Sequence, residues 1–382
     1  MSTTKKVDTG IAIKSPTPNS QKFIIPDASV STAKLADDSV TPDKLMSNGV
    51  NLVINGGMDF FQRGGKSSSV GIGGGFSYQT ADRHAIGHNA GDKTSQSTQR
   101  STDVPDNDLT RYSIHFESTH TGSAGDMLLR HRVESENCRQ VANKKASLSF
   151  WLKSDSADTV DITINRANTV DNFGAITQLH FESQTAPTDG SWNRYIVEGV
   201  DIPEDGVNGI EVIIGVRNFV NTAGTRNHYM TQIMLTEGPK AQEFQRHAPS
   251  IGLEFKACER YYETSFDVTF DPANGPSAGN FATLQGLENV PIMTWTASPI
   301  LTDTTVHFKT TKRVQPTLTK FGDLNGNWTY SVIGTFVLTN ARTPNALISF
   351  NTFGTDKFGL VNNVSTSALL GVQGHWAASA EL

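Results

Sequence analysis

The sequence has few cysteines, few charges and no long apolar run, and each shortage excludes a class of protein. Its two cysteines, Cys138 and Cys258, are too few for a disulfide framework or a cysteine-rich zinc site, and we expect two free thiols. Charged residues make up 18% of the chain, below the roughly 25% of an average soluble domain. The 32 basic residues do not outnumber the 38 acidic ones and form no block, so nucleic-acid binding is not expected.

Hydropathy excludes a membrane-spanning helix. No stretch of about 18 apolar residues occurs, and residues 1–6 lead into no apolar segment of a secretory signal. What the chain does contain is 33 glycines among many Ser, Thr and Asn residues. This composition is typical of short strands joined by polar turns, so we expect an all-β fold without membrane insertion.

Residues 1–50 differ from the rest of the chain. They carry a repeat of ten residues, in which Ser-Val and Lys-Leu recur at fixed spacing. Each unit has too few apolar residues to bury a core within one chain, so it becomes ordered only if several copies share these positions. We therefore expect an extended segment, which is either a stalk that orders in an oligomer or a tether that does not order at all. Its candidate anchor and trimer-stalk residues are Phe23, Ile24, Ile25, Val30, Leu35, Val40 and Leu45.

Residues 51–247 contain regular short apolar runs separated by Asp-Gly and Asn-Gly turns. Convincing helical runs between them are absent, so the pattern favours an antiparallel sandwich over a parallel α/β sheet. The expected strands are Leu148–Lys153, Val160–Ile164, Tyr195–Val197, Ile210–Val216 and Tyr229–Leu235.

Residues 248–382 begin with the best helical segment of the chain, in which Leu253, Ala257 and Tyr261 are spaced by four and could share one face. Further β-like runs follow, and they predict a second antiparallel β-sandwich. The clearest of these runs are Val306–Lys309, Thr317–Phe321 and Tyr330–Leu338.

Four motifs stand in a fixed order along the chain. The first is Asn51–Gly64 with Ala81–Arg83, and the second is Leu148–Lys153 with Trp192–Tyr195. The third runs from Gln232–Gly238 to Cys258–Tyr262. The fourth joins Arg313, Pro316 and Thr317 to the final segment Trp376–Leu382. Together they resemble the distal part of bacteriophage tail fibre proteins, and the ten-residue repeat resembles the stalk units that precede such domains.

The resemblance covers most of residues 27–382 and implies a homotrimeric virion component, made in the host cytoplasm. Residues 1–50 would then dock to other phage tail or virion proteins. Residues 51–247 would form a jelly-roll domain similar to a carbohydrate-binding module, and residues 248–382 a receptor-binding domain. The implied function is attachment to the bacterial surface, by multivalent binding of a host cell-surface glycan. One departure is His84, which stands where the family usually has Trp.

Two other functions stay open. The chain could be a head or decoration fibre, or a structural tail component, with no dedicated ligand. A tailspike depolymerase is the third reading, but such enzymes usually use a long parallel β-helix, whose coil repeat the sequence lacks. No Gly-x-Ser-x-Gly elbow appears, and we expect no enzyme activity.

Motifs for cofactors are incomplete. Gly64–Ser67 resembles the end of a phosphate loop, but Phe60 stands where the loop needs its first glycine. His84 and His88 lie four apart, yet Gly87 and Asn89 disfavour a helix that would pair them as metal ligands. The surroundings of Asp155, Asp158 and Asp161 are acidic, but no calcium loop is present. We predict no cofactor, and a structural calcium ion stays open without an assigned ligand set.

The aromatic residues are the remaining candidates, because sugars pack their C–H faces on aromatic rings. Trp151 and Trp192 lie inside strand patterns, and we expect both in the core. Trp376 is expected in the core or at a trimer contact. Candidate ligand-binding residues are Trp328, which follows an Asn-Gly-Asn turn, with Tyr330 on the same face of an extended run, and Trp295.

Overall fold

The structure is a computed structural model that falls into two units, Met1–Ser47 and Asn48–Leu382, which are described separately. It describes residues 5–6, 12–13, 49–67, 69–88, 93–120, 126–155, 159–186, 188–217, 224–266, 304–321, 329–332, 348–352, 354–362, 370–373 and 375–382. In the first unit, β1 (Lys5–Lys6) pairs antiparallel with β2 (Ala12–Ile13). All seven candidate anchor and stalk residues lie outside the described residues, so the stalk and the trimer stay predictions.

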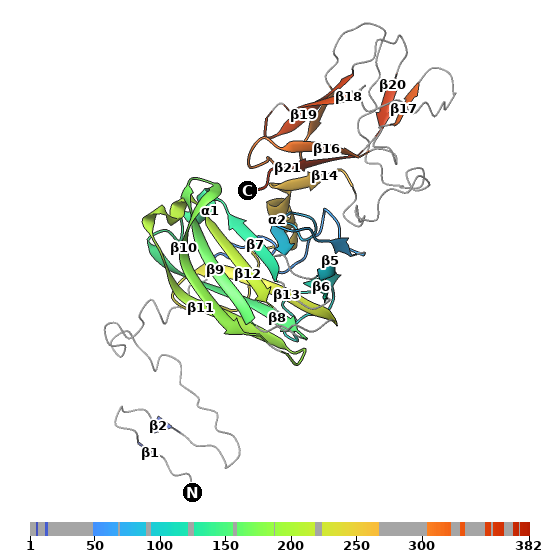
Figure 1. Ribbon diagram of the computed structural model, residues 1–382. Helices are drawn as coiled ribbons and strands as arrows, with labels where there is room; N and C mark the ends of the chain where they lie inside the picture. Colours follow the sequence, from blue (N-terminus) through green and yellow to red (C-terminus); the bar gives the residue numbers. More distant parts are fainter. Residues whose placement is uncertain are drawn as a thin grey trace. The chain divides into compact units, whose positions relative to one another are not determined.

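Two antiparallel sheets dominate the second unit (Figure 1). The five-stranded sheet has the order β10-β9-β12-β7-β4, and the six-stranded sheet has the order β11-β8-β13-β6-β5-β3. Their bounds are β3 Val70–Gly71, β4 His84–His88, β5 Lys93–Ser101, β6 Ser113–His120, β7 Met127–Val133, β8 Lys144–Ser154, β9 Thr159–Thr169, β10 Asn172–Thr185, β11 Trp192–Ile202, β12 Ile210–Arg217 and β13 Gly224–Glu237.

The chain passes repeatedly from one sheet to the other. β7, β8 and β9 alternate between the sheets, and so do β11, β12 and β13. This connectivity is the crossing pattern of a jelly-roll-like sandwich. Two short helices join strands, α1 (Ser135–Cys138) and the 3-10 helix η2 (Glu204–Asn208). The all-β, antiparallel prediction is confirmed, and all five strands expected between residues 51 and 247 are present as β8, β9, β11, β12 and β13.

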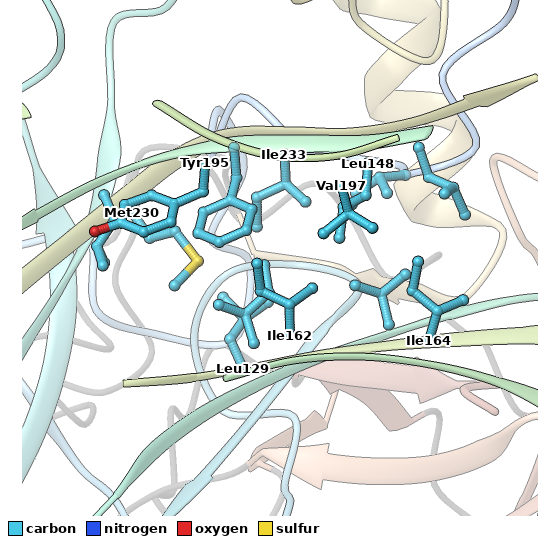
Figure 2. Packing of buried hydrophobic residues seen from close by; sticks show 14 of the residues in the cluster. Leu129, Leu148, Ile162, Ile164, Tyr195, Val197, Met230 and Ile233 are labelled. Atoms are coloured by element: carbon cyan, nitrogen blue, oxygen red, sulfur yellow. The ribbon is translucent and has the colours of Figure 1, made fainter. Parts of the chain in front are cut away.

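Alternation along the strands builds the core between the sheets (Figure 2). On β9, Ile162 and Ile164 are fully buried, and on β8 Leu148 is fully buried as well. Figure 2 shows these side chains facing each other, together with Tyr195, Val197, Met230, Ile233 and Leu129. Because every second residue of a strand points to the same face, the intervening residues are left for the outer faces of the sandwich.

The segment before β3 has no strand, yet residues 51–58 are all buried. Asn51 explains part of this, because its side-chain amide donates to the carbonyls of Ile233 and Gln245 and its oxygen accepts from the Val53 and Leu235 amides. A Cβ on Gly56 would lie 2.0 Å from the Ile233 carbonyl oxygen. The hydrogen bonds of Asn51 and the close approach of Gly56 therefore hold this segment tightly against β13.

The described part of residues 248–382 adds one longer helix and small antiparallel sheets. Helix α2 (Ile251–Glu259) begins at Ser250, whose hydroxyl accepts from the Leu253 amide. The strand orders are β14-β21-β16, β15-β19-β18 and β17-β20. Their bounds are β14 Tyr262–Thr264, β15 Thr304–His307, β16 Thr317–Phe321, β17 Thr329–Val332, β18 Ile348–Thr352, β19 Lys357–Asn362, β20 Leu370–Gln373 and β21 His375–Ser379. Because both expected domains lie within the second unit, the boundary at residue 248 stays a prediction.

The buried face of α2 differs from the one expected. Leu253 is 48% exposed, whereas Glu254 and Cys258 are buried. Glu254 is kept inside because its carboxylate accepts from the amides of Asn55, at 2.6 Å, and Ala248, at 2.7 Å. Of the three residues spaced by four, Tyr261 is buried and Ala257 is partly buried, but Leu253 is exposed, and the hydrogen-bonded Glu254 carboxylate lies inside instead. Among the described residues, no helix is both long and apolar enough to cross a membrane.

Candidate functional site

Five residues lie directly opposite one another across five strands of the six-stranded sheet. The register pairs Trp192 on β11 with Lys153 on β8, and Lys153 with Tyr229 on β13. Tyr229 in turn lies opposite His115 on β6, which lies opposite Gln99 on β5. We call these five residues the cross-strand row. Four steps of about 4.8 Å between strands give the row a length of about 19 Å.

The cross-strand row lies on the outer face of the sandwich. Its strand neighbours Leu152, Ile114 and Met230 are buried in the core, so the row residues point the other way. Trp192 and Tyr229 are half-buried, and so is Trp151, two residues before Lys153 on the same face. The expectation that Trp151 and Trp192 lie in the core was wrong. Strand periodicity places a residue on a face but does not say which face is buried.

Hydrogen bonds fix the Trp192 end of the row. The Asp103 carboxylate accepts from Trp192 Nε1 at 2.9 Å and from Lys153 Nζ at 2.6 Å. Partial burial raises the pKa of Asp103, but these two hydrogen bonds outweigh it and leave the pKa below its usual value. Asp103 is therefore ionised, and it orients the indole at the edge strand.

The middle of the row is an aromatic stack. The His115 and Tyr229 rings are nearly parallel, with centroids 4.3 Å apart, and Lys153 Nζ lies 5.4 Å from the Tyr229 centroid. Because His115 and Lys153 lie against the faces of the Tyr229 ring, Tyr229 offers a ligand its ring edge and its hydroxyl. Burial raises the pKa of Tyr229, and Asp103 adds to the shift, so the hydroxyl stays protonated.

The face beyond the row is covered by the chain itself. Thr231 donates to the Tyr112 carbonyl at 2.8 Å, and Gln232 exchanges hydrogen bonds with Asn107, both from the 102–112 loop. Met234 Sδ accepts from the Gln245 amide at 3.3 Å. The loop and the segment around Gln245 thus form a wall along one side of the row. On the other side, no such wall is formed by the residues that the structure describes, and we call this the open side.

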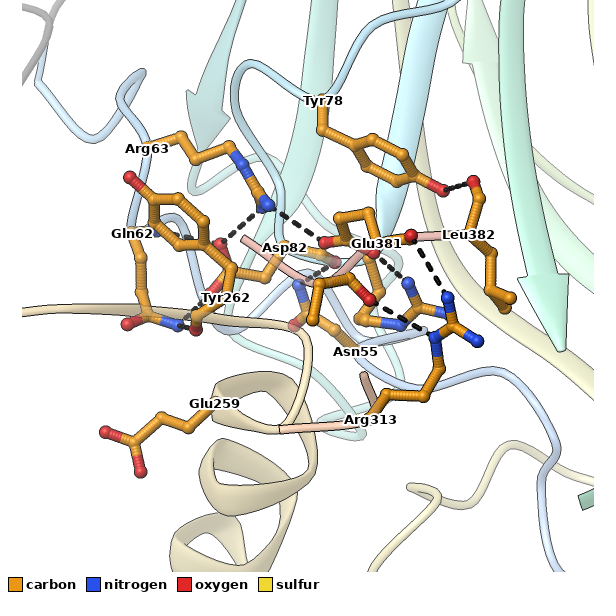
Figure 3. A network of polar contacts seen from close by, with 12 residues as sticks. Asn55, Gln62, Arg63, Tyr78, Asp82, Glu259, Tyr262, Arg313, Glu381 and Leu382 are labelled. Atoms are coloured by element: carbon orange, nitrogen blue, oxygen red, sulfur yellow. Dashed lines mark hydrogen bonds and ion pairs between the residues drawn. The ribbon is translucent and has the colours of Figure 1, made fainter. Parts of the chain in front are cut away.

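A second polar cluster lies where the sandwich contacts residues 259–382 (Figure 3). The Glu381 carboxylate accepts from Arg63 Nη2 at 2.9 Å and from Arg83 Nη1. The Arg83 guanidinium also donates to the Arg132 carbonyl at 2.6 Å and lies 3.5 Å from the Tyr261 ring centroid. Burial lowers the pKa of Arg83, but the Glu381 carboxylate outweighs it and raises the pKa above its usual value.

Neighbouring contacts extend this junction. Gln62 Nε2 donates to Asp82 Oδ2 at 2.8 Å and to the Tyr262 carbonyl at 3.0 Å. Arg132 Nη1 donates to the Leu382 carbonyl at 2.9 Å, and Arg313 Nε donates to the Ala380 carbonyl. Three of the four sequence motifs therefore meet at one place. Each of these three motifs supplies part of one buried polar network.

The sequence-predicted ligand residues have different outcomes. Trp328 and Trp295 lie outside the described residues, so their role stays a prediction. Tyr330 lies on β17, opposite Val372 of β20. Trp376 is buried against the rings of Phe308 and Phe358, at 5.6 and 5.1 Å between centroids, and a trimer contact there stays a prediction.

The described acidic and histidine candidates have separate partners, and Asp158 lies outside the described residues. Asp155 accepts from the Asn227 amide, whereas Asp161 pairs with Arg217. His84 lies in β4 and is fully buried, with its ring 4.9 Å from that of His131. Within the described part of the chain, no three His, Cys, Asp or Glu residues are grouped so that they could hold a metal ion.

The sequence signal for the cross-strand row was weak. Trp192 belonged to a motif that sequence analysis singled out, but Tyr229, His115 and Gln99 come from strands far apart in the sequence. Only the register brings them together. The polar run of β5, Lys-Thr-Ser-Gln-Ser-Thr-Gln-Arg-Ser, gave no strand signal of its own.

No protein-family model and no curated protein matches the sequence. Solved structures do show similarity. The enzymatically active domain of tailspike protein 4 from bacteriophage CBA120 matches with a TM-score of 0.30 and 16% identity, over 41% of this chain and 19% of that one. A family 11 carbohydrate-binding module from Clostridium thermocellum, in complex with a mixed-linked tetrasaccharide, matches with a TM-score of 0.26 and 16% identity, over 46% and 100%.

A third similar structure is a CBM4 domain, with a TM-score of 0.27 and 11% identity, over 47% of this chain and 99% of that one. This chain therefore covers about a fifth of the tailspike domain and nearly all of each carbohydrate-binding module. At these low identities and TM-scores, the similarities decide neither the family nor the ligand.

Proposed function

We propose that this chain is a homotrimeric tail fibre protein that attaches a bacteriophage to its host, and that its sandwich binds a host surface glycan at the cross-strand row. The observation that carries the glycan site is the row itself. It places the half-buried Trp192 ring, the Tyr229 hydroxyl and the Gln99 amide in one line on the outer face of a sheet. An aromatic ring beside hydrogen-bonding groups suits a sugar, which presents both C–H faces and hydroxyls.

The virion assignment is supported by the order of the sequence motifs and by the junction that three of them build. Each glycan site would be weak, with a dissociation constant in the millimolar range, and three copies per fibre would raise the overall affinity by avidity. We further propose that the protein binds its glycan without cleaving it. Incubation of host polysaccharide with the protein should release no reducing sugar, and measurable release would contradict this part of the proposal.

Binding of the labelled full-length protein to host cells and to a glycan array tests the site. Trp192→Ala should weaken binding about tenfold per site, corresponding to about 1.4 kcal/mol. Phe181→Ala is the matched control, because Phe181 is an aromatic residue that is 50% exposed on β10 of the other sheet. Binding by Trp192→Ala and Tyr229→Ala that equals wild type, with intact folding, would remove the row from the proposal.

The anchor is tested on particles. Deletion of residues 1–45 should leave a folded sandwich but abolish incorporation of the protein into virions. Incorporation of the truncated protein at wild-type levels would show that residues 1–45 are not the anchor.

A further inference from the structure

The open side of the cross-strand row carries a second row of polar residues. Ser97 on β5 lies opposite Glu117 on β6, and Glu117 lies opposite Asn227 on β13. Asp155, which follows β8 directly, accepts from the Asn227 backbone amide at 3.1 Å and from its side-chain amide at 3.0 Å. Glu117 and Asp155 are both exposed. Two carboxylates therefore border the row on the side where a ligand can approach.

The cations nearest the row are held by hydrogen bonds, and one of them is bound to a carboxylate. Lys153, the cation of the cross-strand row, is bound to Asp103 at 2.6 Å. Arg194, next to the row on β11, directs Nη2 to Ser149 Oγ and the Gln242 carbonyl, on the side away from Glu117. The charges of Lys153 and Asp103 cancel each other. Among the described residues, the carboxylates of Glu117 and Asp155 therefore give the open side a negative charge.

Polar side chains lie on both sides of the His115 ring. Because the Asn227 amide nitrogen donates to Asp155, its oxygen faces His115 Nε2, at 2.9 Å. The Gln99 amide nitrogen lies 3.5 Å from His115 Nδ1 on the other side. The side-chain amides of Asn227 and Gln99 therefore flank the His115 ring within this face of the sheet.

We infer that the cross-strand row selects uncharged glycans and rejects polyanionic ones, and this inference rests on the proposed function. A glycan that carries carboxylate, sulfate or phosphate groups brings negative charge against Glu117 and Asp155, while the ammonium group of Lys153 is already bound to Asp103. An uncharged glycan offers hydroxyl hydrogens instead. The two carboxylates and the amide oxygens of this face accept hydrogen bonds from such groups, and carboxylates are strong acceptors.

Matched polymers that differ only in charge test the inference. Dextran is compared with carboxymethyl-dextran, and hydroxyethyl cellulose with carboxymethyl cellulose, alongside a glycan array that contains neutral and acidic polysaccharides. We expect the full-length protein to bind the neutral member of a recognised pair at least about tenfold more tightly at low salt. The difference should shrink at about 0.5 M salt, because screening weakens repulsion between exposed charges.

Variants of Glu117 locate the effect. Glu117→Lys should narrow the preference for the neutral polymer at least about threefold, and Glu117→Gln should narrow it less, because it removes one negative charge without adding a positive one. Tighter or equal binding of the acidic polymers by wild type would overturn the inference while leaving glycan binding intact. Binding to no glycan of the array, in either charge class, would instead count against the proposed function, and the inference would fall with it.

Discussion

The junction around Glu381 gives the sharpest prediction for stability. The Arg83 side chain is 1% exposed and that of Glu381 is 7% exposed, so the pair is almost completely withdrawn from water. Removal of one partner of a buried ion pair leaves an uncompensated charge and costs about 3–5 kcal/mol. Glu381→Ala should therefore lower the free energy of unfolding by about that amount. Glu381→Gln should cost less, because its amide oxygen still accepts a hydrogen bond from Arg83.

Urea denaturation followed by both tryptophan fluorescence and far-UV circular dichroism measures this loss, and agreement of the two signals checks that one transition is observed. Glu136→Ala is the control, because the Glu136–Arg139 pair is 66% exposed on both sides, and its midpoint should not change measurably. A double-mutant cycle with Arg83→Met then isolates the coupling between the two residues. If Glu381→Ala unfolded at the same urea concentration as the control variant, the reasoning about the buried network would be refuted.

Two further predictions concern the sandwich. Burial lowers the pKa of His84 to about 3 and that of His131 well below 6.5. The unfolded chain therefore binds more protons than the folded one below pH 6.5, and each histidine should lower the free energy of unfolding by about 2 kcal/mol between pH 7 and pH 5. In urea titrations at the two pH values, His131→Leu should lose less stability than wild type. An equal loss would exclude His131 as a source of the pH dependence. Gly56→Ala should destabilise the protein severely, because its Cβ would lie 2.0 Å from the Ile233 carbonyl oxygen, whereas Gly73→Ala, with no atom within 4 Å, should melt like wild type.

The sequence predicted strands well where one face is apolar. Val160–Ile164 alternates cleanly because its isoleucines enter the core, and β9 contains that run. It missed β5, whose residues are almost all polar and whose pairing is decided by its neighbours β3 and β6. Tertiary pairing, rather than local propensity, makes that segment a strand.

The candidate site shows the same division. Periodicity placed Trp151 and Trp192 in strands, but which side of a sheet is covered depends on the second sheet and on the 102–112 loop. The cross-strand row depends on the register among five strands that are separated by up to 130 residues, from Gln99 to Tyr229. In contrast, Arg83 and Glu381 both belong to motifs that the sequence analysis identified. The sequence did not predict that the two residues contact each other.

The separation of Arg83 from Glu381 has a consequence for the life of the newly made chain. The two residues are 298 positions apart, and a ribosome that adds about 5–20 residues per second needs about 15–60 s to reach the second after the first. Throughout that interval the Arg83 guanidinium lacks its carboxylate partner. A sandwich that folds during synthesis therefore does so without this ion pair, and it reaches its full stability only once residue 381 has been added.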